Sequence, residues 1–129
     1  VGETLAQRES GQTAEVVAAQ MSAVLDKAGV AAFAGAVVAY EPVWAIGSGQ
    51  AATPEQAEQV AAPLRAVVAQ ALGDDAAAKT RILYGGSVGA SNIAGFMREP
   101  NVDGALVGGA SLKINDFSAI VRYQKHVGV

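Results

Sequence analysis

The sequence contains no cysteine and a single histidine, His126, among its 129 residues. Without cysteine the chain forms no disulfide and offers no thiolate, and with one histidine we expect no zinc site built by this chain alone. Aromatic residues make up 5% and charged residues 16% of the chain, and the net charge is only −3. This balance gives no electrostatic basis for binding nucleic acid. We therefore expect a small molecule or another protein as the partner.

Long apolar runs are also missing, because charges or glycines interrupt every stretch of about 18 residues, the length that spans a bilayer. No basic segment leads into an apolar one near the N-terminus. From these absences we expect no membrane association and a cytoplasmic location. The first residue is Val1 rather than methionine, from which we expect that the polypeptide starts elsewhere than at a natural beginning.

Hydrophobic residues make up 51% of the chain, which is enough for a core, and the length suits at most one modest domain. Short apolar runs predict strands at residues 36–40, 81–84 and 105–107. Amphipathic or capped segments predict helices at residues 12–28, 54–72 and 91–98, and a last helix capped near residue 115 or 116. This alternation predicts parallel βαβ units whose strands are buried on both faces.

Several local features refine this interpretation. Helical spacing in the first helix predicts a buried stripe of Val17, Met21, Val24, Leu25 and Ala28, ended by Gly29. Pro63 in the second helix removes a backbone donor and should bend it, at a cost of about 3 kcal/mol. We interpret Asp74 and Asp75 as a solvated turn and Glu3 as a surface residue.

Glu41 directly follows the first predicted strand, and parallel α/β folds bind ligands beyond the carboxyl ends of their strands. An apolar, glycine-punctuated loop follows it at residues 42–49. A carboxylate shielded by such a loop would have its charged form disfavoured and would be a better base. The alternative is a solvated glutamate at a strand end. Trp44 is interpreted as an anchor of this loop, and the alternative for Trp44 is a residue that only fills the core.

Glycine-rich loops follow the other two predicted strands, at residues 85–87 and 108–111. Glycines let the backbone approach a ligand closely, and the loops would present amide donors to it. Neither loop contains lysine or arginine, so a phosphate would be held by amides, a hydroxyl and helix dipoles. The alternative is that these glycines only make tight turns.

Three segments at these positions, residues 39–49, 84–88 and 103–112, closely resemble the active-site segments of the triosephosphate isomerase family, in the family's order. The resemblance covers essentially the whole chain, and residues 1–3 resemble the end of the family's fifth strand. It implies an α/β fold, the C-terminal half of a TIM (β/α)8 barrel. Residues 1–129 would form a single partial barrel unit, from the end of strand 5 through helix 8.

The resemblance also implies an activity: interconversion of dihydroxyacetone phosphate and glyceraldehyde 3-phosphate through an enediolate, without cofactor or metal. The mechanism comes from the family, for which a carboxylate base and a neutral histidine electrophile are established. It implies that Glu41 is the base. It implies phosphate binding by Gly47, Ser87, Gly108 and Gly109. It implies a closing lid and its cover formed by Pro42, Val43, Trp44, Ala45, Ile46, Ser48, Gly49, Tyr84 and Leu106, in which Ile46 and Leu106 cover the base and Tyr84 and Ser87 latch the lid.

A complete barrel of this kind has eight βα units in about 250 residues. The family's catalytic lysine and electrophilic histidine match no residue of this chain, so we expect the isolated chain to be inactive or to show only a trace of activity. Open sheet edges would need a partner, either the N-terminal half of the barrel, the rest of a longer chain, or a second copy. The alternative is a noncatalytic half-barrel module that self-associates and binds phosphate weakly at most. Another phosphate-binding barrel enzyme is disfavoured by residues 40–49.

Overall fold

The computed structural model describes residues 1–126, and the side chains of residues 1–124. The helices and strands are α1 (Leu5–Glu9), α2 (Thr13–Ala28), β1 (Val37–Tyr40), α3 (Pro54–Leu72), α4 (Asp74–Lys79), β2 (Arg81–Tyr84), α5 (Ile93–Met97), β3 (Gly104–Ala105) and α6 (Ile114–Val121). Short 3-10 turns span Val30–Phe33, Val43–Ala45, Gly109–Leu112 and Tyr123–His126. The side chain of His126 therefore lies outside the described part of the chain.

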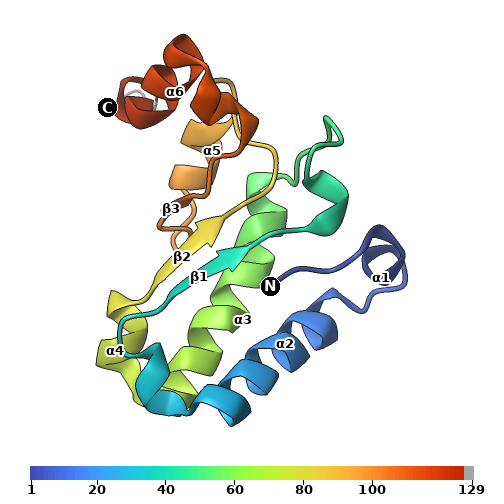
Figure 1. Ribbon diagram of the computed structural model, residues 1–129, viewed down its shortest axis with the longest axis vertical. Coiled ribbons are helices and arrows are strands. Elements are labelled where there is room, and N and C mark those ends of the chain that lie inside the picture. Colours follow the sequence, from blue (N-terminus) through green and yellow to red (C-terminus); the bar gives the residue numbers. More distant parts are fainter. Residues whose placement is uncertain (127–129) are drawn as a thin grey trace.

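The strands of the described residues form one parallel sheet in the order β1-β2-β3 (Figure 1). Val37 pairs with Arg81 and Tyr40 with Tyr84, while Leu83 pairs with Gly104. Helices α3 and α4 connect β1 to β2, and α5 connects β2 to β3. The predicted alternation of parallel strands and helices is confirmed, because parallel neighbours need such crossover connections.

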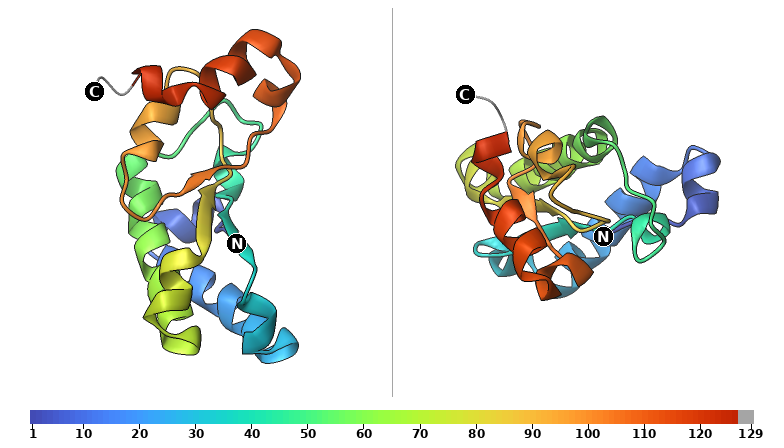
Figure 2. Two further views of the ribbon diagram at one scale, coloured as in Figure 1. Left: turned by 90° about the vertical axis from the view of Figure 1, so that its left-hand side faces the viewer. Right: turned by 90° about the horizontal axis from the view of Figure 1, so that it is seen from above.

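The core lies on one face of this sheet. Val38, Tyr40, Ile82 and Tyr84 are at most 6% exposed and belong to the same apolar cluster as the inner face of α3, which runs along one side of the strands (Figure 2). The strand residues whose side chains point to the other face are more exposed to solvent, and Val37 among them is 52% exposed. The prediction that the strands are buried on both faces was wrong, because helices cover only one face among the described residues.

Helix α2 begins one residue later than predicted and ends at Gly29, whose φ of 80° suits glycine. Of its predicted stripe, Val17 and Met21 are buried. Leu25 is partly buried and packs against the core, whereas Val24 is 48% exposed and Ala28 is also exposed, so the predicted stripe was correct only in part. The reason is that α2 packs against α3 with a short part of its surface, and Figure 1 shows the two helices side by side.

Helix α3 has the predicted bounds. Thr53 and Gln56 form a capping box at its start, and Gly73 follows its last residue. The helix continues without interruption through Pro63. The bend at Pro63 stays a prediction.

Several predicted boundaries were wrong, including those of α5, which spans Ile93–Met97 rather than residues 91–98. Asp74 and Asp75 are not a turn but the first turn of α4, where carboxylates stabilise the helix dipole, and Lys79 does the same in the last turn. Strand β3 covers two residues rather than residues 105–107, because no further described strand pairs with its outer edge. Helix α6 begins at Ile114 with Lys113 at its N-cap position, two or three residues before the predicted cap at residue 115 or 116. Helix α1 was missed, although Thr4 and Gln7 form a capping box.

Arg65 of α3 holds together the amino-terminal ends of β2 and β3. Its guanidinium donates to the carbonyl oxygens of Ala77 and Thr80, and to the carboxylate of Asp103. The same carboxylate accepts the backbone N–H of Ile82 in β2. This arrangement holds the two strands in register, so that their carboxyl ends open onto the same edge of the sheet.

Candidate functional site

A cavity of about 560 Å³ lies beyond the carboxyl ends of the strands. It is lined by Glu41, Ala45, Ile46, Gly47, Gly85, Gly86, Ser87, Val88, Leu106, Val107, Gly108, Gly109 and Ala110. The structure therefore brings the residue expected to act as the base together with all four residues expected to bind phosphate. They come from the loops after all three strands, which is the edge where ligands of parallel α/β folds bind.

Glu41 follows β1 directly and is held at the edge of the sheet by its backbone. Its N–H donates to the carbonyl oxygen of Val1 over 2.7 Å. Its side chain lies over Gly85, where an added Cβ would come within 2.6 Å of the Glu41 Cγ. Its carboxylate accepts no hydrogen bond from the described residues, so it is free to take a proton from a ligand in the cavity.

Backbone amides supply the donors of the cavity. The N–H groups of Gly47, Gly108 and Gly109 make no hydrogen bond within the described part of the chain. Gly109 opens the 3-10 turn that follows β3. The described residues that line this cavity include no lysine or arginine, so an anion would be held there by amide dipoles. Residues 1–126 also contain no cluster of His, Asp or Glu suited to a metal ion.

The loop after Glu41 is half anchored and half exposed. Pro42 and Ala45 are buried, whereas Val43 and Ile46 are 53% and 51% exposed. Gly47, Ser48 and Gly49 are also exposed, whereas Trp44 is partly buried. Ile46 and Leu106 line the cavity with Glu41, but both remain about half exposed. In this conformation they flank the carboxylate without sealing it from water.

Ser87 contacts the middle of this loop, and Tyr84 contacts the chain just beyond its end. The Tyr84 hydroxyl accepts the N–H of Ala52 over 2.9 Å, and the ring stacks on Phe96. The Ser87 hydroxyl and N–H both donate to the carbonyl oxygen of Ala45. A ligand that takes a hydrogen bond from Ser87 must therefore replace its contact with the loop.

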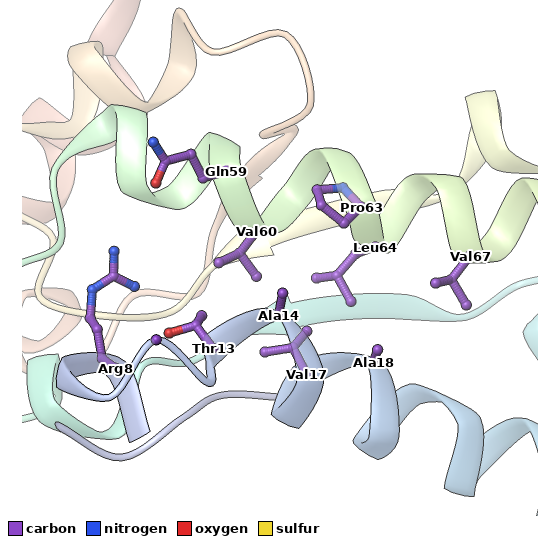
Figure 3. A pocket seen from close by; sticks show the side chains of 11 residues that line it. Arg8, Thr13, Ala14, Val17, Ala18, Gln59, Val60, Pro63, Leu64 and Val67 are labelled. Atoms are coloured by element: carbon purple, nitrogen blue, oxygen red, sulfur yellow. The ribbon is translucent and has the colours of Figure 1, made fainter. Parts of the chain in front are cut away.

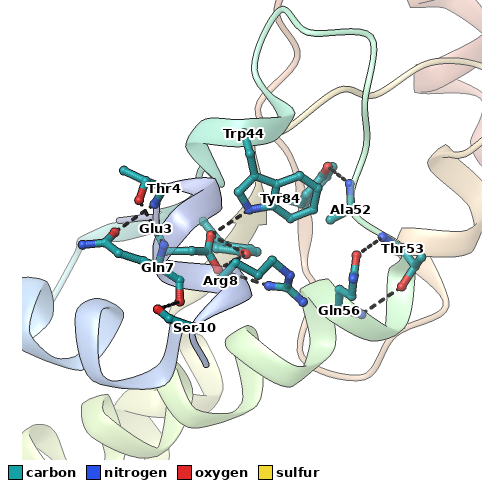
Figure 4. A network of polar contacts seen from close by, with 11 residues as sticks. Glu3, Thr4, Gln7, Arg8, Ser10, Trp44, Ala52, Thr53, Gln56 and Tyr84 are labelled. Carbon is teal, nitrogen blue, oxygen red and sulfur yellow. Dashed lines mark hydrogen bonds and ion pairs between the residues drawn. The ribbon is translucent and has the colours of Figure 1, made fainter. Parts of the chain in front are cut away.

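Glu3 was expected on the surface, and that expectation was wrong, because its side chain is fully buried. Figure 4 shows the network around it. Its carboxylate accepts from the hydroxyl of Tyr40 at 2.9 and 3.0 Å and from the indole N–H of Trp44 at 3.3 Å. It also pairs with Arg8, whose guanidinium lies over the Trp44 ring. These partners offset the cost of burying a charge.

This network fixes the beginning of the loop. Tyr40 immediately precedes Glu41, and Trp44 stands three residues after it, so one buried carboxylate holds both sides of the expected base. Burial, and next the adjacent Glu3 carboxylate, raise the pKa of the Tyr40 hydroxyl far above its usual range. Sequence reasoning missed the burial of Glu3 because Tyr40 and Trp44, which enclose its carboxylate, lie 37 and 41 positions away in the sequence, although Arg8 is only five positions away. One sequence signal could have indicated that Glu3 is buried. Residues 1–3 resemble the end of a strand, and such a strand would lie beside β1.

The chain is similar in sequence to known isomerases. The family model of triosephosphate isomerase matches residues 1–124. The chain belongs to the triosephosphate isomerase family. Triosephosphate isomerases of Leifsonia xyli subsp. xyli and Pseudomonas entomophila are 70% identical over 127 residues and 52% identical over 122 residues. These matches cover 98% and 95% of this chain. They cover 48% of each relative, so the chain spans about half the length of the curated relatives it matches.

Membership in the triosephosphate isomerase family agrees with the observed α/β architecture, a parallel sheet with flanking helices that corresponds to part of a TIM barrel. No helix among residues 1–126 combines the length and the hydropathy needed to cross a bilayer.

Proposed function

We propose that this chain provides the base, the lid and the phosphate cradle of a triosephosphate isomerase. The observation that carries the proposal is the cavity in which Glu41 faces the same space as the free amides of Gly47, Gly108 and Gly109. Family membership supports the same substrate, a small phosphorylated triose. The residues would act in the cytoplasm, where glycolytic chemistry takes place.

In the proposed reaction the Glu41 carboxylate removes a proton from the carbon next to the triose carbonyl. An enediolate forms, and a proton moves from the hydroxyl oxygen of the neighbouring carbon to the former carbonyl oxygen by way of a group that the N-terminal half would supply. The protonated carboxyl then returns its proton to the neighbouring carbon. Gly47, Gly108 and Gly109 hold the phosphate through N–H groups, and Ser87 joins them when it releases Ala45. No cofactor is needed for this proton transfer.

The loop at residues 42–49 would close over the substrate. Val43, Ile46 and Leu106 are about half exposed in the open conformation, and closure would bring Val43 and Ile46 toward Glu41 and Leu106. Exclusion of water strengthens electrostatic interactions and protects an enediolate from losing its phosphate. Trp44 stays fixed by Glu3 at the beginning of this movement, and Tyr84 holds the chain at Ala52 beyond the loop's end.

The family's catalytic lysine and electrophilic histidine have no counterpart in these 129 residues. We therefore propose that the chain by itself is inactive or nearly so, and that the N-terminal half of the barrel supplies both groups. The uncovered face of the sheet supports this, because Val37 on that face is 52% exposed. Self-association as a noncatalytic module is the second candidate, supported by the exposed apolar residues Leu112 and Ile114.

Complementation tests the proposal. The chain is mixed with the separately expressed N-terminal half of the Leifsonia xyli relative, and the conversion of glyceraldehyde 3-phosphate is followed in a coupled assay. We expect activity in the mixture and none, or a trace, in either half. Glu41→Asp should lower the rate at least about 100-fold, as expected for a displaced general base. Glu9→Asp, a change at an exposed carboxylate of α1, is the matched control.

A stable complex without activity would contradict the isomerase function and favour the noncatalytic module. Activity that Glu41→Asp leaves unchanged would contradict the role of Glu41 and retain the family function. The two failures are thus distinguishable.

A further inference from the structure

A second cavity shares no lining residue with the first and lies in the groove between α1 and α2 on one side and α3 on the other (Figure 3). Its volume is about 330 Å³, at the lower end of the range for small-molecule sites, about 300 to 1,000 Å³. The walls are mainly apolar and include Val17 of α2 and Val60, Leu64 and Val67 of α3. The ring of Pro63, for which the family resemblance offers no role, is part of the same wall.

Arg8 stands at one end of this groove (Figure 3) and is the charged member of its lining. Its NH1 group donates to Glu3 over 3.1 Å, and its side chain is 20% exposed. The Nε and NH2 groups donate to no acceptor within the described residues. Water reaches them, because the described side chains contain no buried polar atom without a partner. The free edge of the guanidinium therefore offers two parallel N–H donors beside an apolar groove.

A guanidinium edge beside an apolar groove favours a ligand that has both an anionic group and an apolar body. A planar carboxylate accepts two parallel hydrogen bonds from a guanidinium edge. A phosphate dianion would be poorly neutralised, since Arg8 already shares its charge with Glu3. The apolar walls suit a compact hydrocarbon body. We infer that the groove between α1, α2 and α3 is a binding site for a small apolar carboxylic acid, with the carboxylate on Arg8 and the body between Val17 and Leu64.

The site would be coupled to Trp44. The Arg8 guanidinium carbon lies 5.2 Å from the centre of the Trp44 ring, so a carboxylate on Arg8 changes the surroundings of the indole. Trp44 is the single tryptophan of the sequence, which makes its indole N–H an unambiguous reporter. The inference itself does not depend on the isomerase function.

The test is a titration of the ¹⁵N-labelled chain with cyclohexanecarboxylate, followed by amide chemical shifts. We expect saturable shifts at Ala14, Ala18 and Val67, which line the groove, and at the Trp44 indole. The expected Kd is about 1 mM, as for a small fragment with few contacts. The neutral isostere cyclohexylmethanol should bind at least about tenfold more weakly, because it loses the charge-assisted hydrogen bonds.

Two variants fill the groove from exposed positions of α2, Ala14→Leu and Ala18→Leu. Each should weaken binding at least about tenfold by occupying the space of the hydrocarbon body. Ala19→Leu is the matched control, because Ala19 is exposed on the same helix but does not line the groove. It should bind as tightly as the unmodified chain.

Three results would overturn the inference. They are equal binding of the acid and the alcohol, unchanged binding in both groove-filling variants, and shifts confined to Gly108 and Gly109 in the other cavity. The comparison of acid and alcohol uses the unmodified chain, so it decides the matter even if a variant fails to fold.

Discussion

Gly85 leaves the space that the side chain of Glu41 occupies. A Cβ built at this position would lie 2.6 Å from the Glu41 Cγ, closer than real contacts allow. From the sequence alone, we expected this glycine to let the backbone approach a ligand closely. The structure adds a second cause, since the glycine first accommodates the side chain expected to act as the base.

Gly85→Ala should therefore displace Glu41 and lower the activity of the complemented enzyme about 100-fold, because small misplacements of reacting groups are costly. The coupled assay described above measures this. Gly89→Ala is the control, since an added Cβ there meets nothing within 4 Å. Equal losses in the two variants would show that Gly85 does not act through Glu41.

The buried hydroxyl of Tyr40 should make the free energy of unfolding decrease as the pH rises in the alkaline range. Burial and the adjacent Glu3 raise the pKa of its hydroxyl, while the same group in the unfolded chain ionises near pH 10. Below that pH the contribution of Tyr40 to the free energy of unfolding is complete. Above it the unfolded state loses the proton first, so stability falls as the pH rises.

Urea denaturation at a series of pH values between about 8 and 11 measures this loss. Tyr40→Phe should flatten the alkaline part of the curve, although burial also raises the pKa of Tyr84 and some slope remains. Tyr123→Phe, at a partly exposed position, should keep the original slope. An unchanged slope in Tyr40→Phe would contradict the prediction.

The ends of helix α3 follow from local sequence patterns, whereas its interior contains a proline, which disfavours a helix. Its capping box and the glycine after its last residue are local patterns, and both ends were predicted correctly from them. Pro63 breaks the local rule, yet the helix continues through it, because Val60, Leu64 and Val68 bury the inner face against the sheet and α2. Tertiary packing thus outweighs the local propensity.

Pro63→Ala should raise the free energy of unfolding by about 1–3 kcal/mol, because it restores a backbone donor in the helix interior. Pro63 is exposed, so the change removes little buried surface. Denaturant unfolding gives the measurement. Pro54→Ala is the control and should change stability little, since proline at the first helical position loses no hydrogen bond. A destabilised Pro63→Ala variant would show that the ring packs favourably in its groove.

At the scale of the molecule, several large apolar side chains have no cover. Leu112 and Ile114 are 87% and 85% exposed, and Val121 of α6 is 63% exposed. We expect the chain without a complement to self-associate, with a mass in sedimentation above that of the monomer. Replacing Leu112 and Ile114 together by lysine should reduce the association without unfolding the chain, because neither side chain packs in the core. A compact monomer of the unmodified chain would contradict this expectation.

The sequence by itself determined the alternation of strands and helices and the ends of α3, and it indicated the segments that we propose form an isomerase site. These depend on contacts close in sequence, such as Thr53 with Gln56, or on contiguous motifs. Only the tertiary structure decided that Glu3 is buried, that one face of the sheet is open, and that a groove lies beside Arg8. The Glu3 carboxylate meets Tyr40 and Trp44 across 37 and 41 positions of sequence. Such contacts arise when separate elements pack together, and local sequence does not encode them.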